Sequence, residues 1–179
     1  QNGRQGEMSA PAPNGAMSDG ATTSTCIALL REGQKLELRG DVPGAIAKYN
    51  EILALSQGVQ HEEQRQNIKT AAVGSLGSAY DNLGQYDKAI EHLNQALAIA
   101  REIGNRKGEG NTLGNLGNAY NRLGQYDKAI EHHNQALAIS REIGDRQGEG
   151  SHLGNLGNAY YSLGQYDKAI EHHNQALAI

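Results

Sequence analysis

Histidines are the side chains of this sequence best suited to chemistry, as metal ligands or as bases. There are two adjacent pairs, His132–His133 and His172–His173. Neighbouring residues of a helix point about 100° apart, and the two pairs are too far from each other to share a metal whose ligands sit ~2 Å away. His133 also stands where an internal repeat, described below, has Leu93 on an apolar stripe. We therefore expect a packed, hydrogen-bonded His133, His132 on the outer face of its helix, and no metal site.

The other reactive side chains form no catalytic arrangement. Cys26 is the single cysteine and has no histidine at a defined spacing, so we expect it to be a small apolar filler. Asp127, Lys128 and Glu131 are typical of charges on a helix surface. The string GEGNTLG at 108–114 lacks the GxGxxG spacing of a dinucleotide loop and follows no predicted strand. We predict that the chain is not an enzyme and has no cofactor.

Composition excludes several classes of partner. The chain has 179 residues with 16 basic and 20 acidic side chains, a net charge of −4, so it offers no basic field to nucleic acid and no polybasic stretch to a membrane. No apolar run approaches the ~18 residues of a membrane span, and the first residues lack the apolar core of a signal peptide. We expect a cytoplasmic protein and, because the chain begins at Gln1, a piece of a longer one.

An internal repeat dominates the second half of the sequence. Residues 111–139 and 151–179 match at 25 of 29 positions, and residues 71–99 match 111–139 at 21 of 29. A weaker copy precedes these three at 27–55, at a slightly wider spacing. The three similar copies recur every 40 residues. A period of 40 residues is typical of stacked repeats, in which one unit cannot bury its apolar face alone.

The apolar spacing within each unit predicts two helices. Apolar residues recur at i, i+3, i+4 and i+7, first from Leu113 to Leu123 and then from Tyr126 to Leu137. Gly124 separates the two stripes. Each unit is therefore predicted to be a helical hairpin, with a first (A) helix and a second (B) helix.

These residues resemble the tetratricopeptide repeat family. The motif L-x2-L-G-x2-Y at 113–120, followed by A-x3-H at 129–133, is similar to that family's W-x2-L-G-x2-Y and A-x3-F. The 40-residue period is similar to the branch that includes LGN/Pins modulators, kinesin light chains and bacterial arrays. The resemblance covers 27–179 and implies an all-α fold, a right-handed α-solenoid of tandem hairpins. The weaker copy at 27–55 departs from the pattern, with Glu32 and Leu36 where the others have Leu and Tyr.

The predicted organisation is a tail followed by four hairpins. Residues 1–21 are expected to be a flexible N-terminal tail. Residues 22–179 are expected to hold four units at about 26–59, 60–104, 105–144 and 145–179, called repeats 1 to 4 below. The last unit is expected to be uncapped.

Each A helix carries a polar stripe, and the resemblance implies that A helices line a concave groove that binds peptides. An Asn amide both donates and accepts hydrogen bonds, so it can pair with the backbone of an extended segment. The alternative is a solvated helix face. The predicted peptide-binding residues are Ser78, Asp81, Asn82, Asn111, Gly114, Asn115, Asn118, Asn121, Arg122, Ser151, Gly154, Asn155, Asn158 and Tyr161.

Comparison of repeats 3 and 4 supports the stripe. The four differences between 111–139 and 151–179 all lie in the A helix. A binding array would vary its A helices in this way while it keeps its B helices unchanged. Drift after a duplication would give the same pattern. Gly114 faces the predicted groove, and a glycine in a helix interior is costly. We interpret Gly114 as room for the backbone of a ligand, and sequence drift is the alternative.

The sequence thus predicts a scaffold that binds a protein or peptide segment in the concave groove, with neither nucleic acid nor membrane as a partner. A regulatory or sensor arm of a larger signalling protein is one alternative. The other is a structural module that self-associates through its uncapped C-terminal end.

Overall fold

The computed structural model describes residues 18–179. Most of the predicted tail, residues 1–17, lies outside this range. The predicted tail of residues 1–21 overlaps the first helix, because Asp19–Ala21 form the first turn of that helix. Ser18 caps this helix by accepting a hydrogen bond from the Ala21 N–H, and the acidic Asp19 suits the positive end of the helix dipole.

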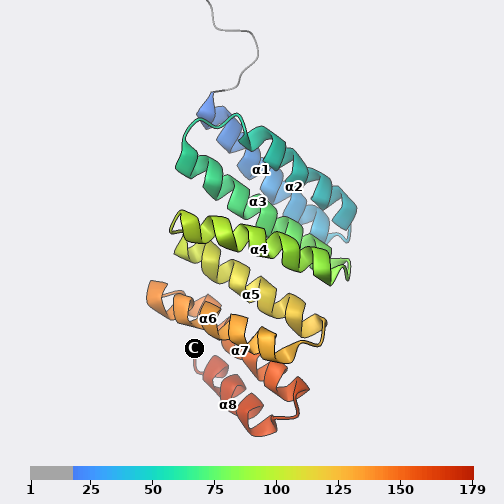
Figure 1. Cartoon of the computed structure of the whole chain (residues 1–179), viewed down its shortest axis with the longest axis vertical. Coiled ribbons are helices and arrows are strands. Elements are labelled where there is room, and N and C mark those ends of the chain that lie inside the picture. Colours follow the sequence, from blue (N-terminus) through green and yellow to red (C-terminus); the bar gives the residue numbers. More distant parts are fainter. Residues whose placement is uncertain (1–17) are drawn as a thin grey trace, which may run out of the picture.

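The described residues form eight α-helices and no strand, arranged as four antiparallel hairpins that stack along one axis (Figure 1). The helices are α1 (Asp19–Leu38), α2 (Val42–Ser56), α3 (Glu62–Asn82), α4 (Tyr86–Glu102), α5 (Arg106–Arg122), α6 (Tyr126–Ile143), α7 (Arg146–Ser162) and α8 (Tyr166–Leu177). The all-α solenoid of tandem hairpins predicted from the repeat is confirmed.

Turn chemistry sets the ends of the helices. Gly124 between α5 and α6 has a φ of 77°, a left-handed conformation that glycine adopts without a Cβ clash. Asn105 and Asp145 begin α5 and α7 by accepting hydrogen bonds from the N–H groups of Gly108 and Gly148. Because these signals are local, they can be read in the sequence.

The core is shared between successive hairpins. Leu93 of α4, Leu113 and Leu116 of α5 and Ala136 of α6 are all buried in one cluster. A second cluster joins Leu137 of α6 to two leucines of α7. Each hairpin therefore buries its apolar stripe only with the help of its neighbours.

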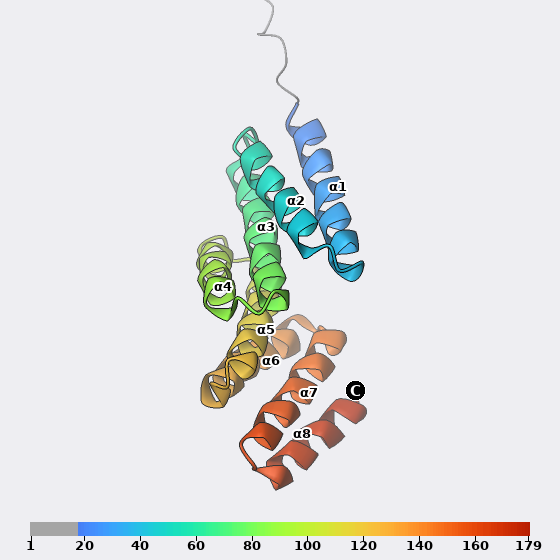
Figure 2. The same ribbon diagram turned by 90° about the vertical axis from the view of Figure 1, so that its right-hand side faces the viewer.

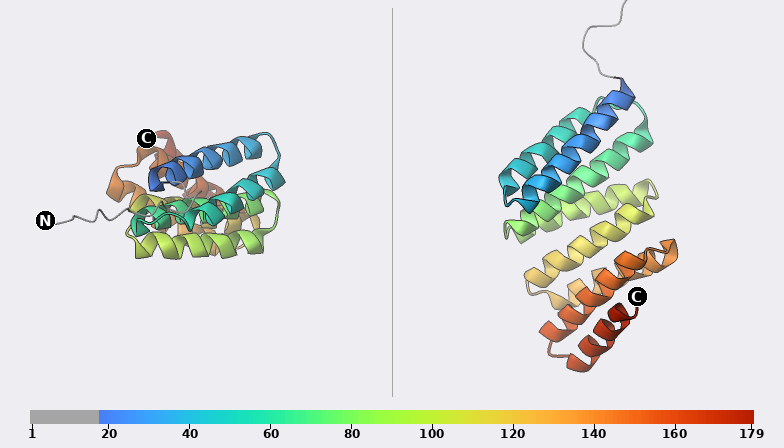
Figure 3. Two further views of the ribbon diagram at one scale, coloured as in Figure 1. Left: turned by 90° about the horizontal axis from the view of Figure 1, so that it is seen from above. Right: turned by 180° about the vertical axis from the view of Figure 1, so that it is seen from behind.

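The array is curved. Figure 2 shows α1 and α7 on one side of the molecule and α4 on the other, and Figure 3 shows the same stack from above and from behind. Within residues 18–179, no helix has both the length and the apolar character that crossing a bilayer requires.

The first junction between hairpins differs from the others. Helix α3 has 21 residues, whereas α5 and α7 have 17 each. The additional residues, 62–65, form an extra N-terminal turn. This turn explains why repeats 1 and 2 are spaced more widely in the sequence than the later repeats.

Candidate functional site

A groove of about 800 Å³ runs across the A helices α1, α3, α5 and α7. Its lining comes from these four helices and from Asn105 and Asp145, the N-caps of α5 and α7. The B helices contribute no lining residue among those described. The stacking of hairpins therefore aligns one face of every A helix on the same surface.

Half of the predicted binding residues lie in this groove. They come from α3, α5 and α7, and most carry an amide or a hydroxyl group. They are Ser78, Asn111, Gly114, Asn115, Asn118, Ser151 and Asn155.

The other half lie outside the groove lining. Five of them are in the last turns of α3, α5 and α7, beside the hairpin turns, and two are the α7 counterparts of Gly114 and Asn118. They are Asp81, Asn82, Asn121, Arg122, Tyr161, Gly154 and Asn158.

Asp81 and Arg122 contact each other across repeats 2 and 3. Asp81 Oδ2 lies 3.4 Å from Arg122 Nη1, and the aspartate side chain is only 11% exposed. Burial raises the pKa of Asp81, and the Arg122 guanidinium opposes that rise. This pair connects α3 to α5.

The N-terminal part of the groove is lined by residues that were not predicted from the sequence. Lys107 and Gln147 line it one turn before Asn111 and Ser151, and Asn67 occupies the matching place in α3. The signal was present, because these residues continue the polar stripe at a spacing of four. The groove residues of α1 were harder to predict from the sequence, because repeat 1 matches the other repeats poorly.

Polar side chains in the groove bond across repeats. Asn105 Nδ2 donates to Asn67 Oδ1 at 2.8 Å, and Asn115 Nδ2 donates to Ser78 Oγ at 3.0 Å. These bonds hold neighbouring A helices in register and orient the amides of the groove floor. Amide groups offer both donors and acceptors, which are the groups that an extended backbone can pair with.

Charge in the groove is sparse. Glu37, Lys107 and Asp145 are its acidic and basic lining residues. Glu37 accepts a hydrogen bond from the Tyr49 hydroxyl at 3.1 Å, and burial raises the pKa of its carboxyl. The groove is therefore polar and close to neutral.

Gly114 has a packing role, which differs from the predicted role of making room for a ligand backbone. A Cβ at Gly114 would lie 2.6 Å from His152 Cε1, so this glycine makes room for a side chain of the next A helix. At the equivalent Gly154, a Cβ would meet no described atom within 4 Å. Gly114 is thus explained by packing between repeats.

The histidines also differ from expectation. His133 is 1% exposed and packs against Gly117, but within residues 18–179 its Nδ1 finds no hydrogen-bond partner. Burial, together with His152 and His132, lowers the pKa of His133 to about 4. His132 is not on an outer face, because its ring stacks on Tyr120 with centroids 5.2 Å apart.

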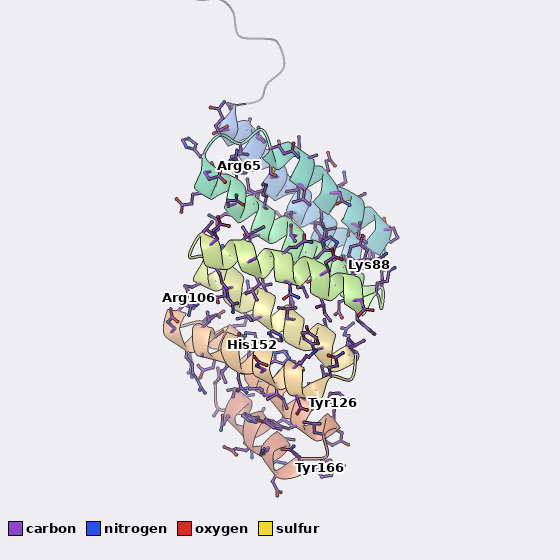
Figure 4. All side chains as sticks on the ribbon, viewed as in Figure 1. Arg65, Lys88, Arg106, Tyr126, His152 and Tyr166 are labelled. Atoms are coloured by element: carbon purple, nitrogen blue, oxygen red, sulfur yellow. The ribbon has the colours of Figure 1, made fainter. Side chains whose placement is uncertain are left out.

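The described residues contain no group of three or more His, Cys, Asp or Glu side chains that could hold a metal ion. His133 and His152 come together with ring centroids 6.0 Å apart, without a third ligand among the described residues. Figure 4 labels His152 among the side chains of the array.

Comparison with known proteins shows which chains this one resembles in sequence and in fold. Human G-protein-signaling modulator 1 is 32% identical over 99 residues, which are 50% of this chain and 14% of that protein. The structure of aspartyl phosphate phosphatase F from Bacillus subtilis superposes with a TM-score of 0.75 at 20% identity, covering 88% of this chain and 40% of that one.

A signal transduction ATPase with a tetratricopeptide repeat sensor from Pyrococcus horikoshii superposes with a TM-score of 0.70 at 19% identity. That match covers 87% of this chain and 24% of the ATPase. The three matches thus cover between 14% and 40% of the length of each relative, and the two structural likenesses show the fold alone.

The model of one family matches the repeats directly. Described as tetratricopeptide repeat, it matches residues 68–142 and 108–179. These ranges include repeats 3 and 4 with their L-x2-L-G-x2-Y motifs, and they cover more than half of the chain. Together with the stacked hairpins, this match shows that the chain belongs to the tetratricopeptide repeat family.

Proposed function

We propose that this chain binds an extended protein or peptide segment along the groove of its A helices. The observation that carries the proposal is that amide and hydroxyl side chains from α3, α5 and α7 meet in one continuous groove. A segment in this groove would pair its backbone with the Asn amides. Such pairing is indifferent to most ligand side chains.

Because the groove carries few charges, we expect salt to have a small effect on the affinity for the bound segment. With Glu37, Lys107 and Asp145 as the charged lining residues, few contacts can be screened. Binding should therefore weaken only mildly when salt is raised. A steep loss of affinity with salt would contradict backbone pairing as the main contribution.

A random library of short peptides on phage, selected against the immobilised full chain, tests the proposal. The peptides that it yields are then measured against a groove variant that combines Asn111→Ala, Asn118→Ala and Asn155→Ala. All three residues line the groove, and Asn115 is left intact because it bonds to Ser78. We expect at least a tenfold loss of affinity without unfolding, since Ala is a better helix former than Asn.

A matched control uses three exposed asparagines of the B helices, Asn94, Asn134 and Asn174, which are changed to Ala together. This variant should bind the same peptides within about twofold. Selected peptides that bind the groove variant as tightly as the unchanged chain would overturn the proposal.

A sensor arm of a larger protein is the second candidate function. The observation that favours it is the likeness to the repeat sensor of the Pyrococcus horikoshii ATPase. A sensor must change shape when it binds. X-ray scattering with and without a selected peptide should then show a change in the radius of gyration, whereas a passive scaffold would show none.

A further inference from the structure

A second cavity of about 630 Å³ lies between α1 and α3. Its walls are largely apolar, and we call it the anchor pocket. The apolar side chains that line it are Cys26, Ile27, Leu30, Ile52, Ile68 and Ala71.

The anchor pocket is continuous with the groove. Leu30, Asn67 and Ala71 line both cavities. The polar groove thus ends in an apolar recess at the repeat 1 side of the array. A segment lying in the groove can reach the pocket without leaving the surface of the A helices.

The anchor pocket arises from the extra turn of α3. His61, Glu62, Glu63 and Gln64 form one of its walls, and they belong to this turn or cap it. Helices α5 and α7 start one turn later in the repeat and have no such extension. The pocket is therefore a feature of one junction of this chain and not of the repeated unit.

We propose that the anchor pocket receives one large apolar side chain at the end of the segment bound in the groove. The inference rests on the proposed function. A row of similar amides that recurs in every repeat lets a backbone slide from one repeat to the next. The anchor pocket removes this ambiguity, since burial of an apolar side chain there stabilises one register over the others. The pocket fixes the register and direction of the ligand.

The rim of the pocket further restricts the ligand. Glu62 and Glu63, in the wall formed by the extra turn, are exposed at the pocket, and Arg65 pairs with Glu62. Asp19 lies nearby, where it accepts hydrogen bonds from the N–H groups of Gln60 and His61. An acidic residue next to the anchor would be repelled. The ligand is a segment with a large apolar residue at one end, no acidic neighbour, and uncharged polar residues beyond it.

The phage selection described above tests this proposal with one added variant, Ile27→Asp. Ile27 lines the pocket but not the groove and is 45% exposed, so a charge there should be tolerated by the fold. The matched control is Leu38→Asp on the same helix, which is 89% exposed and lines neither cavity. Selected peptides should share a large apolar residue near one end. Their affinity should fall at least tenfold on Ile27→Asp and change less than twofold on Leu38→Asp.

A double-mutant cycle identifies the contact. Replacing the apolar residue of the peptide by Ser should weaken binding to the unchanged chain about tenfold but cause no further loss on Ile27→Asp. If circular dichroism shows that Ile27→Asp is unfolded, Ile27→Ser replaces it in the cycle. Additive losses in the cycle would overturn the anchor.

The two proposals fail in different ways. Peptides that need the groove asparagines but show no apolar preference, and that bind Ile27→Asp normally, would overturn the anchor and leave the groove in place. Peptides that ignore both variants would overturn both. Light scattering that shows a dimer of the unchanged chain, lost in Ile27→Asp, would assign the pocket to a second copy and also overturn the anchor.

Discussion

At the scale of single residues, the most consequential difference between repeats 3 and 4 is His152, which stands where repeat 3 has Thr112. Its ring lies against Gly114 and near His133, so it joins two neighbouring repeats and also lines the groove. One substitution in a nearly identical repeat thereby changes both the packing at a junction and the chemistry of the groove floor.

Two equivalent glycines should respond oppositely to alanine. Gly154→Ala should raise the free energy of unfolding by about 0.5–1 kcal/mol, because Ala is the better helix former and the added Cβ meets open space among the described residues. Gly114→Ala should lower it, because the Cβ would clash with His152 Cε1 at 2.6 Å. Urea unfolding measures both.

The double variant Gly114→Ala with His152→Thr serves as the control for that pair. It should recover the stabilisation, since Thr112 holds the place of His152 in repeat 3 and a Cβ at Gly74, the counterpart of Gly114, meets only Ala96 Cβ at 3.8 Å. A Gly114→Ala chain that is as stable as Gly154→Ala would contradict the packing account.

His133 should make the fold sensitive to acid. Its pKa is lowered from 6.5 to about 4, so below pH 6.5 the unfolded chain binds a proton that the folded chain does not. Stability should therefore fall as the pH drops, and between about pH 7.5 and about pH 5 this residue should cost about 2 kcal/mol.

His133→Leu should remove this part of the pH dependence and keep or raise stability at neutral pH, because repeat 2 holds the fully buried Leu93 there. Urea unfolding at the two pH values compares the variant with the unchanged chain. An unaltered pH dependence would show that another group titrates. Added zinc should leave the melting temperature unchanged.

At the scale of helices, buried carboxylates connect each of two A helices to the B helix before it. Glu149 of α7 accepts from Arg141 Nε of α6 at 2.8 Å and from Arg146 Nη1 at 3.0 Å. Glu109 of α5 is held in the same way by Arg101 and Arg106. Arg106, at the edge of the array in Figure 4, also pairs with Glu142 of α6.

Glu149→Gln should lower the melting temperature, because Gln cannot satisfy two guanidinium groups. The hydrogen bond from Arg141 is the main reason that the pKa of Glu149 lies below 4.5. The stabilisation should therefore be present above that pH and be lost as the pH falls through the lowered pKa. The exposed Glu91→Gln is the control, and equal effects of the two changes would argue against a stabilising role of the Glu149 ion pairs.

At the scale of the whole molecule, identical sequences have different environments in α6 and α8. Leu137 of α6 is 6% exposed because α7 covers it, whereas Leu177 of α8 is 85% exposed. Ile170 of α8 is 59% exposed. The face of α8 that would meet a following A helix is therefore an apolar surface, which favours association.

We predict that the chain self-associates as its concentration rises and that Ile170→Lys with Leu177→Lys reduces this association. Sedimentation velocity over a range of concentrations measures it. Leu38→Lys on α1, at a side chain that is 89% exposed, controls for the added charge. A chain that stays monomeric at every concentration would contradict the prediction.

The sequence by itself determined the repeat, the helical hairpins and the family, because periodicity and turn chemistry are local. The stripe from Leu113 to Leu123, the glycine at 124 and the cap at Asn105 can each be recognised from a few neighbouring residues. The burial of His133 could be predicted because Leu93 occupies the equivalent position in repeat 2.

Only the tertiary structure decided which polar residues share the groove. A helical stripe gives the angle of a residue around its helix, but its depth in a groove depends on the helices stacked on either side. Asp81 and Arg122 have suitable chemistry but pair with each other beside the hairpin turns. The side chain that fills the space at Gly114 belongs to the next repeat, and the anchor pocket exists because an extra turn of α3 faces α1. Such contacts arise from packing between distant segments, and no local pattern contains them.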